Sequence, residues 1–176
     1  MAEDDAMSFR VVAAQGCRTS CPAEIAADGI IAPDSADAFR AVAATLAPRP
    51  VVVRLASAGG NLVGGLQLGQ AFREFNATLI VGKGARCVSA CVYAFLGGAV
   101  RRVTGGRIGV HRFRSEGDEG ERDFPSVLVQ RANEILSEYA TRMGADPDLI
   151  GLAMRTSPPA IHYLDAAELR RYRVIN

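Results

Sequence analysis

The sequence lacks tryptophan altogether, and it holds only two histidines and four cysteines among its 176 residues. It also lacks any apolar run of the roughly 18–20 residues that a membrane-spanning helix needs, so no membrane span is predicted. The formal net charge is +1, and basic residues neither form runs nor alternate with aromatic ones. This absence argues against nucleic acid as a partner.

The first residues show few of the features that mark an export signal. The segment MAEDDAMSFRVVAAQG is acidic where a secretion signal is basic, and it contains no long apolar stretch. Two locations stay open: the cytoplasm, or an exported and periplasmic location after removal of a signal. With 49% apolar and 22% charged residues, the composition is that of a globular protein of one domain.

The four cysteines form two pairs with the same spacing, Cys17 with Cys21 and Cys87 with Cys91. Zinc knuckles usually have two residues between their ligands, and a second ligand pair normally lies close to the first in the sequence. The spacing therefore disfavours a metal site, and nothing in the sequence requires a cofactor. One or two disulfides, which form in an oxidising compartment, and plain buried thiols both stay open.

Short apolar segments that favour strands alternate along the chain with segments of helical periodicity. The segments VVVRLA (residues 51–56) and ATLIVG (77–82) are rich in aliphatic residues, which predicts strands buried on both faces. The alternation predicts an α/β fold with a largely parallel sheet. The longest helix is predicted over residues 126–143, with an apolar stripe formed by Val127, Leu128, Ile135, Leu136, Tyr139 and Met143.

The segment ARCVSACVYAFLGG (residues 85–98) places a serine at the predicted start of a short apolar helix. There the Ser89 hydroxyl lies beside free backbone N–H groups and the positive end of the helix dipole, which favour developing negative charge. The small Ala90 leaves the adjacent amide uncrowded. The simpler alternative is that Ser89 only caps the helix.

Two further segments carry candidate functional groups. In SAGGN (residues 57–61), Gly59 and Gly60 let the main chain approach a substrate carbonyl without a Cβ in the way, although such a turn before a helix is common. His111 ends the strand-like segment RIGVH, where a lone histidine is most often structural. Paired with a nucleophile held at a turn, it becomes a candidate general base.

Taken in order, the segments RLASAGGNLVGGLQLG, ARCVSACVYAFLGG and RIGVHRF resemble the Clp protease proteolytic subunit family, within the Clp/crotonase superfamily. The resemblance extends from about Gly29 to Asn176 and leaves residues 1–28 as an N-terminal strand or arm. It is closest to divergent bacterial relatives that carry a CxSAC motif. The fold that it implies is an α/β spiral of ββα units with a protruding handle helix, here over residues 126–143.

The same resemblance assigns roles in acyl transfer to individual residues. It places the nucleophile on Ser89, the general base on His111, and the oxyanion amides on Gly60 and Ala90. It implies a peptide or protein substrate and a homo-oligomeric ring or stacked ring, with contacts from the handle helix. It also implies a substrate-binding edge that consists of Ser57, Gly59 and Asn61.

One position departs from the family pattern. The family's third catalytic residue, an aspartate shortly before the final helix, aligns with Ile161, which cannot orient a histidine. Nearby Asp165 is better explained as a cap of that helix, because Asp165 and Glu168 have capping-box spacing. Catalysis would then depend on a Ser89–His111 dyad, with His111 held by a backbone carbonyl or by an unforeseen carboxylate.

Three functions therefore remain in competition. The favoured one is a serine peptidase-like hydrolase that uses the Ser–His pair and a backbone oxyanion hole. The second is a weakly active or inactive Clp-like binding or scaffold protein, which the loss of the aspartate at Ile161 favours. The third is a crotonase-type acyl-CoA enzyme, and the pairing of Ser89 with His111 argues against it because crotonases do not rely on a serine nucleophile.

Overall fold

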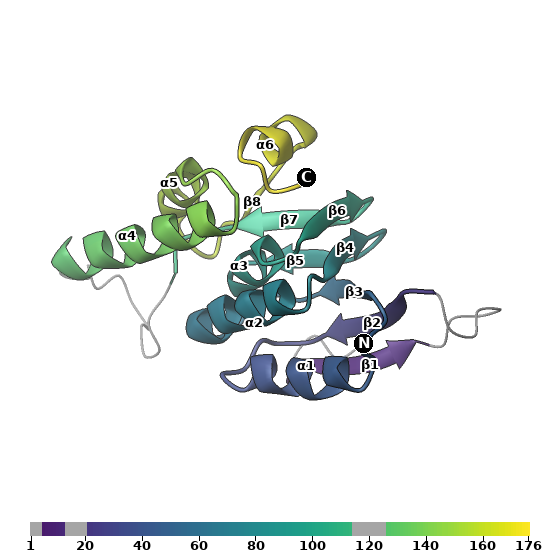
Figure 1. Ribbon diagram of the computed structural model, residues 1–176. Helices are drawn as coiled ribbons and strands as arrows, with labels where there is room; N and C mark the ends of the chain where they lie inside the picture. Colours follow the sequence, from purple (N-terminus) through teal and green to yellow (C-terminus); the bar gives the residue numbers. More distant parts are fainter. Residues whose placement is uncertain (1–4, 13–20, 114–125) are drawn as a thin grey trace.

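The computed structural model describes residues 5–12, 21–113 and 126–176. Within them, five strands form the main sheet in the order β1-β2-β3-β4-β6, with β2, β3, β4 and β6 parallel and β1 antiparallel to β2 (Figure 1). The α/β fold with a largely parallel sheet is therefore confirmed. The strands of this sheet are β1 Ser8–Val12, β2 Ala23–Asp28, β3 Val51–Ala56, β4 Thr78–Gly82 and β6 Val100–Thr104.

Three shorter strands form a second sheet, in the order β5-β7-β8. Strand β5 runs parallel to β7, and β8 is antiparallel to it. Because β5 follows β4 directly, the chain passes from the main sheet into the smaller one just before it reaches Ser89. The bounds are β5 Arg86–Val88, β7 Arg107–Val110 and β8 His162–Tyr163.

Helices connect the parallel strands, and α2 packs between α1 and α3 (Figure 1). The aromatic centre of this layer is an edge-to-face contact between Phe39 and Phe72, whose ring centroids lie 4.7 Å apart. Both side chains are fully buried, so this contact fixes α1 against α2. The helices are α1 Ser35–Ala44, α2 Leu62–Glu74, α3 Ala90–Leu96, α4 Ser126–Arg142, α5 Asp148–Arg155 and α6 Ala166–Arg171.

The prediction that β3 and β4 are covered on both faces is wrong. Along β3, the buried Val53 and Leu55 flank an exposed Arg54, and β4 likewise alternates between buried and half-buried positions. Arg54 pairs with Glu24 of β2 on the outer face. Helices cover one face of the sheet, so charged side chains on the other face stay in water.

The apolar stripe predicted for the long helix α4 is buried only from Leu136 onward. Tyr139 is fully buried there, whereas Val127, Leu128 and Ile135 are 69%, 57% and 43% exposed. In Figure 1 the N-terminal half of α4 extends away from the body of the protein, as expected for a handle helix. No helix in the described ranges combines the length and the apolar character needed to cross a membrane.

Two arginines fix the C-terminal end of α3. Arg73 of α2 donates to the carbonyl oxygens of Gly97 and Leu96, and Arg101 of β6 donates to Leu96 as well, at 2.8 Å. Burial, and to a lesser extent the charge of Arg73, lowers the pKa of Arg101 to about 10. The two guanidinium groups lie at the negative end of the α3 dipole, which anchors this helix at the end opposite to Ser89.

Candidate active site

Ser89 lies between the last residue of β5 and the first residue of α3. Its backbone has φ 58° and ψ −126°, a conformation that is uncommon for a residue with a side chain. The Ser89 amide donates to the carbonyl of Gly109, at 3.0 Å. The partly exposed hydroxyl makes no capping hydrogen bond, so the alternative in which Ser89 merely caps α3 finds no support.

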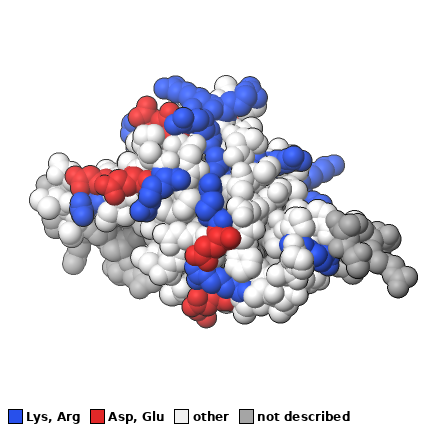
Figure 2. All heavy atoms as spheres, viewed as in Figure 1, with Lys and Arg blue, Asp and Glu red and all other residues white. Residues whose placement is uncertain are grey.

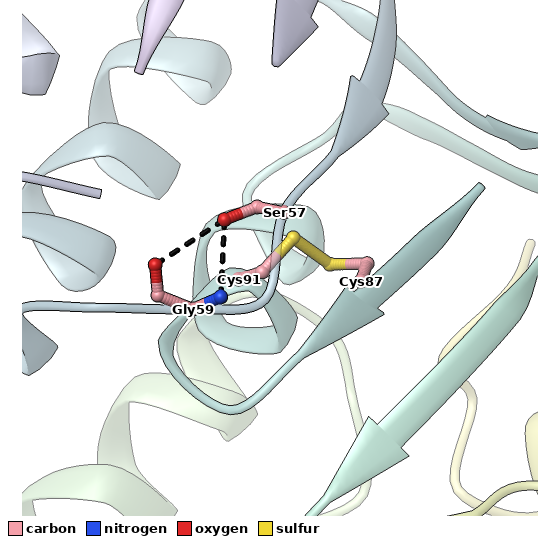
Figure 3. Close-up of a disulfide and its surroundings, with 4 residues drawn as sticks. All are labelled: Ser57, Gly59, Cys87 and Cys91. Atoms are coloured by element: carbon pink, nitrogen blue, oxygen red, sulfur yellow. Dashed lines mark hydrogen bonds between the residues drawn. A yellow bond between two sulfur atoms is a disulfide. The ribbon is translucent and has the colours of Figure 1, made fainter. Parts of the chain in front are cut away.

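A disulfide encloses this turn. Cys87 lies two residues before Ser89, and Cys91 lies two residues after it. The two cysteines are bonded to each other, and both side chains are fully buried (Figure 3). The disulfide alternative therefore holds for this pair. Cys21 is also disulfide-bonded, and Cys17 lies outside the described residues.

The SAGGN turn lies directly against Ser89. The hydroxyl of the buried Ser57 accepts a hydrogen bond from the Gly59 amide and donates one to the Gly59 carbonyl, at 3.1 and 3.2 Å (Figure 3). A Cβ added to Gly59 would lie 2.8 Å from the Ser89 Cβ and 3.2 Å from the Ala90 nitrogen. Gly59 also has φ +108°, so both its conformation and its surroundings require glycine.

Two backbone amides near the serine are candidate donors to an oxyanion. Ala90 is the first residue of α3, where an amide has no partner within the helix. Gly60 directly follows Gly59, the glycine that packs against Ser89. In the described part of the chain, neither amide donates to a backbone carbonyl. These are the two amides predicted to hold an oxyanion.

His111 directly follows β7, and the register of β5 with β7 pairs Val88 with Gly109. This pairing brings the end of β7 beside Ser89. The Nδ1 atom of His111 lies 2.7 Å from the carbonyl oxygen of Arg112. Because a carbonyl only accepts, Nδ1 carries the proton in this contact and Nε2 carries the lone pair, which is the tautomer that a general base uses.

Ser89 and His111 line the same small pocket, at which α3, β7 and α5 meet. No hydrogen bond joins their side chains in the structure as described. All other lining residues except Tyr93 have aliphatic side chains, and no lining residue carries an acidic, lysine or arginine side chain. The remaining lining residues are Val92, Tyr93, Val110, Leu149, Ile150 and Ala153.

The acidic residues near the C-terminus have other partners. Ile161 packs against β7, where its Cγ2 would lie 2.6 Å from a Cβ added to Gly109. Glu168 lies 2.9 Å from Nε2 of His162 and, with Asp165, forms the capping box of α6. This segment therefore supplies no carboxylate to His111, whose one hydrogen-bond partner among the described residues is the Arg112 carbonyl.

Two features of the site were not predicted from the sequence. Asn61, expected at the substrate edge, uses its side-chain oxygen to accept from the Gly64 amide at 2.8 Å and so caps α2. Tyr93 lines the pocket, although the sequence analysis did not single it out. The signal for Tyr93 was its position four residues after Ser89, because residues i and i+4 share one face of a helix.

Neither a family model nor a curated protein matches the sequence, but solved structures resemble the fold. A serine-to-alanine mutant of 1510-N, a membrane-bound stomatin-specific protease, has a TM-score of 0.65 and 18% identity over 87% of this chain and 75% of its own. A lysine-to-alanine mutant of the same protein, in complex with a substrate peptide, has the same TM-score and identity over 87% and 71%. A ClpP1 mutant from Listeria monocytogenes has a TM-score of 0.60 and 15% identity over 87% and 88%.

At these identities the likeness establishes the fold, which is the Clp protease-like α/β fold expected from the sequence. It does not transfer the chemistry of any one of these proteins. This chain has a single lysine, Lys83, which is exposed in the turn between β4 and β5. Lys83 and Ser89 lie beyond opposite ends of β5, so a lysine is not placed to serve as the base for Ser89.

The contact between Gly59 and Ser89 can be tested by adding one methyl group. We expect Gly59→Ala to destabilise the fold by about 1–3 kcal/mol, the usual cost of overpacking, and to reduce the reactivity of Ser89 toward a fluorophosphonate probe. Urea unfolding and the rate of labelling measure the two effects. Gly84→Ala is the control, because Gly84 also has a positive φ but a Cβ there would meet nothing within 4 Å. Equal loss of labelling in both variants would contradict the role of this contact.

Removal of the disulfide should cost stability as well. Closing such a short loop restricts the unfolded chain by about 2 kcal/mol, so we expect the Cys87→Ala/Cys91→Ala variant to melt about 4–8 °C lower than the wild type. Differential scanning calorimetry measures the shift. Reduction of the wild type opens this bond and the disulfide of Cys21 together, so the reduced protein should melt at least as low as the variant. An unchanged melting temperature in both samples would show that the bond does not brace the turn.

Proposed function

We propose that this protein is a serine peptidase-like hydrolase with Ser89 as nucleophile and His111 as general base. The observation that supports this function best is that both side chains line one pocket. The Ser89 hydroxyl makes no capping hydrogen bond to α3. The contact of His111 with the Arg112 carbonyl leaves Nε2 free to accept a proton. The backbone carbonyl here takes the place that a carboxylate has in a Ser-His-Asp triad.

In the proposed reaction, His111 takes the proton of the Ser89 hydroxyl while the oxygen attacks a peptide carbonyl. The amides of Gly60 and Ala90 donate to the resulting oxyanion, a contribution worth about 3–4 kcal/mol per donor in well-studied proteases. His111 then gives its proton to the leaving amine. Water, activated by the same imidazole, releases the acyl group and restores Ser89.

The peptide substrate would lie along the exposed part of the SAGGN turn. Ser57 and Gly59 shape this turn through their mutual hydrogen bonds, and the cap formed by Asn61 fixes the start of α2 behind it. These residues therefore support a substrate edge through the main chain.

Covalent labelling tests this proposal. A fluorophosphonate probe is expected to label the wild type, to leave Ser89→Ala unlabelled, and to react about 10²–10⁴-fold more slowly with His111→Ala, the usual contribution of a general base. Intact-protein mass spectrometry measures the adduct. Ser137→Ala, on α4, is the matched control and should label like the wild type. Labelling of the wild type and Ser89→Ala to the same extent would rule the proposal out.

The second candidate function is peptide binding without catalysis. The presence of Ile161 in place of the family's aspartate favours it, because no carboxylate orients His111 in the described part of the protein. The two candidates differ in one outcome. A binding protein would retain affinity for peptides while the wild type failed to react with the probe.

We further propose that copies of this chain assemble through α4. Its first turn exposes Val127 and Leu128, and the exposed pair of Arg131 with Glu134 follows about one turn later. In Figure 2, blue and red side chains cover the region where Figure 1 places α4. Apolar side chains grouped at the free end of a protruding helix favour burial against another surface. A second copy of this chain is the partner that the resemblance to the Clp protease family implies.

Charge substitution on this surface tests the assembly. We expect the wild type to sediment as an oligomer and Val127→Glu/Leu128→Glu to sediment as a monomer, because burial of two carboxylates without partners is costly. Val11→Glu, which changes another exposed valine, on β1, should leave the oligomer intact. A wild type that sediments as a monomer at every concentration would exclude the assembly.

A further inference from the structure

Ser57 is a buried serine whose hydroxyl holds the main chain beside the candidate nucleophile. The residue is only 4% exposed. Its hydroxyl donates to the Gly59 carbonyl at 3.2 Å and accepts from the Gly59 amide at 3.1 Å (Figure 3). Because this buried hydroxyl already donates and accepts within its own turn, any effect of Ser57 on the site passes through Gly59.

The carbonyl that Ser57 contacts belongs to the same peptide unit as the Gly60 amide. This peptide bond is trans, so its C=O and its N–H point in opposite directions. The Gly59 carbonyl also accepts from the Ile31 amide, at 2.8 Å. Two donors therefore hold the oxygen end of the peptide unit, and the Gly60 N–H at the other end points away from Ile31.

The side that faces away from Ile31 is the side on which Ser89 lies. The main chain of Ser57 pairs with β5 through two backbone hydrogen bonds of 2.8 and 3.1 Å, and β5 ends directly before Ser89. The turn therefore lies between Ile31 and the serine segment. A Cβ added to Gly59 would meet the Cβ of Ser89 at 2.8 Å, which shows how closely the two segments pack.

The Ser57 hydroxyl also affects how well the Gly60 amide donates. A donor at the oxygen of a peptide unit polarises the N–H at its other end, and hydrogen bonds linked in this way strengthen one another. An oxyanion develops only as a carbonyl is attacked, so a well-aligned amide stabilises the transition state more than the bound substrate. Loss of the hydroxyl should therefore slow the chemical step and leave substrate binding almost unchanged.

We propose that Ser57 is a positioning residue of the oxyanion hole, which holds the Gly59–Gly60 peptide unit with its N–H toward the carbonyl that Ser89 attacks. This inference rests on the proposed function, because it concerns the oxyanion formed in that reaction. Ser57 touches neither the substrate nor the reacting atoms. The Gly60 donor is a backbone group, and Ser57 is the side chain through which its contribution can be measured.

A pair of activated esters tests this role. The probes are 4-nitrophenyl acetate and its thionoacetate analogue, in which sulfur replaces the carbonyl oxygen and accepts hydrogen bonds only weakly. The release of nitrophenolate in the first turnover gives the acylation rate at saturation and the half-saturating concentration for each ester. The rate of Ser89→Ala is subtracted as the background. The ratio of the oxygen ester rate to the sulfur ester rate then reports on the oxyanion hole.

We expect Ser57→Ala to acylate about 10-fold more slowly with the oxygen ester, the usual effect of one lost hydrogen bond. This loss is smaller than the roughly 10²–10³-fold cost of removing a whole oxyanion donor, because the Ile31 amide still holds the Gly59 carbonyl. The half-saturating concentration should stay near the wild-type value, and the oxygen-to-sulfur ratio should fall. This ratio does not depend on the amount of folded protein, so it remains informative if the variant is less stable.

Ser35→Ala is the matched control. Ser35 is the other buried serine among the described residues, and its hydroxyl accepts from the Ala32 amide at 2.9 Å. Its removal also deletes a buried hydrogen bond to the main chain, but that bond does not involve the Gly59–Gly60 peptide unit. Urea unfolding compares the stability of the two variants. Ser35→Ala should keep the wild-type oxygen-to-sulfur ratio.

The outcomes separate this inference from the function on which it rests. A wild-type ratio in Ser57→Ala, or an equal fall of the ratio in Ser35→Ala, would overturn the role of Ser57 and leave the hydrolase proposal standing. A wild type that releases nitrophenolate no faster than Ser89→Ala, and that a fluorophosphonate does not label, would overturn both.

Discussion

The close approach of one glycine to one serine is the contact on which this site depends. Gly59 lies so near Ser89 that a methyl group would collide with it, and this approach joins the turn after β3 to the start of α3. The hydroxyl of Ser57 holds the turn from one side, and the disulfide encloses the serine segment from the other. Each of these constraints acts on the main chain, so the side chains that face the pocket remain free for a ligand.

His111 contacts a backbone carbonyl where a histidine of a Ser-His-Asp triad contacts a carboxylate. Ile161, directly before β8, occupies the position where the family pattern has an acid, and the acids that follow it stabilise α6. His162 already shares Glu168 with this cap. A carbonyl orients the imidazole of His111 and selects its tautomer, but it carries no full charge with which to stabilise an imidazolium. A slower enzyme than a complete triad would be the chemical consequence.

The sequence predicted the parts of the structure that depend on local pattern. Alternation of apolar strands and helices was sufficient for the α/β fold, and the spacing of Asp165 and Glu168 identified a capping box that the structure contains. Periodicity could not show that one face of β3 remains open to water. Apart from Arg54, the residues of β3 are aliphatic on both faces of the strand. Periodicity also could not tell where α4 leaves the core, since exposed and buried apolar residues look alike in a sequence.

For the candidate site, the sequence suggested members but not the contacts between them. Motif order brought Ser89, His111 and the two amides into one hypothesis, and the structure brings the two side chains to one pocket. The contact of His111 with the Arg112 carbonyl and the place of Tyr93 in the pocket lining could not be predicted from the sequence. Each depends on how a side chain turns within the folded protein. Three-dimensional packing, rather than residue type, sets such contacts.

The position of Lys83 has a practical consequence for biochemical work on this molecule. It provides the only side-chain amine, and that amine is exposed beyond the end of β5 that lies away from Ser89. Reagents such as succinimidyl esters would therefore attach a dye, biotin or solid support to the side chains at one defined point. Molecules coupled to a surface through it would share one orientation, with the serine's end of the strand turned away from the support.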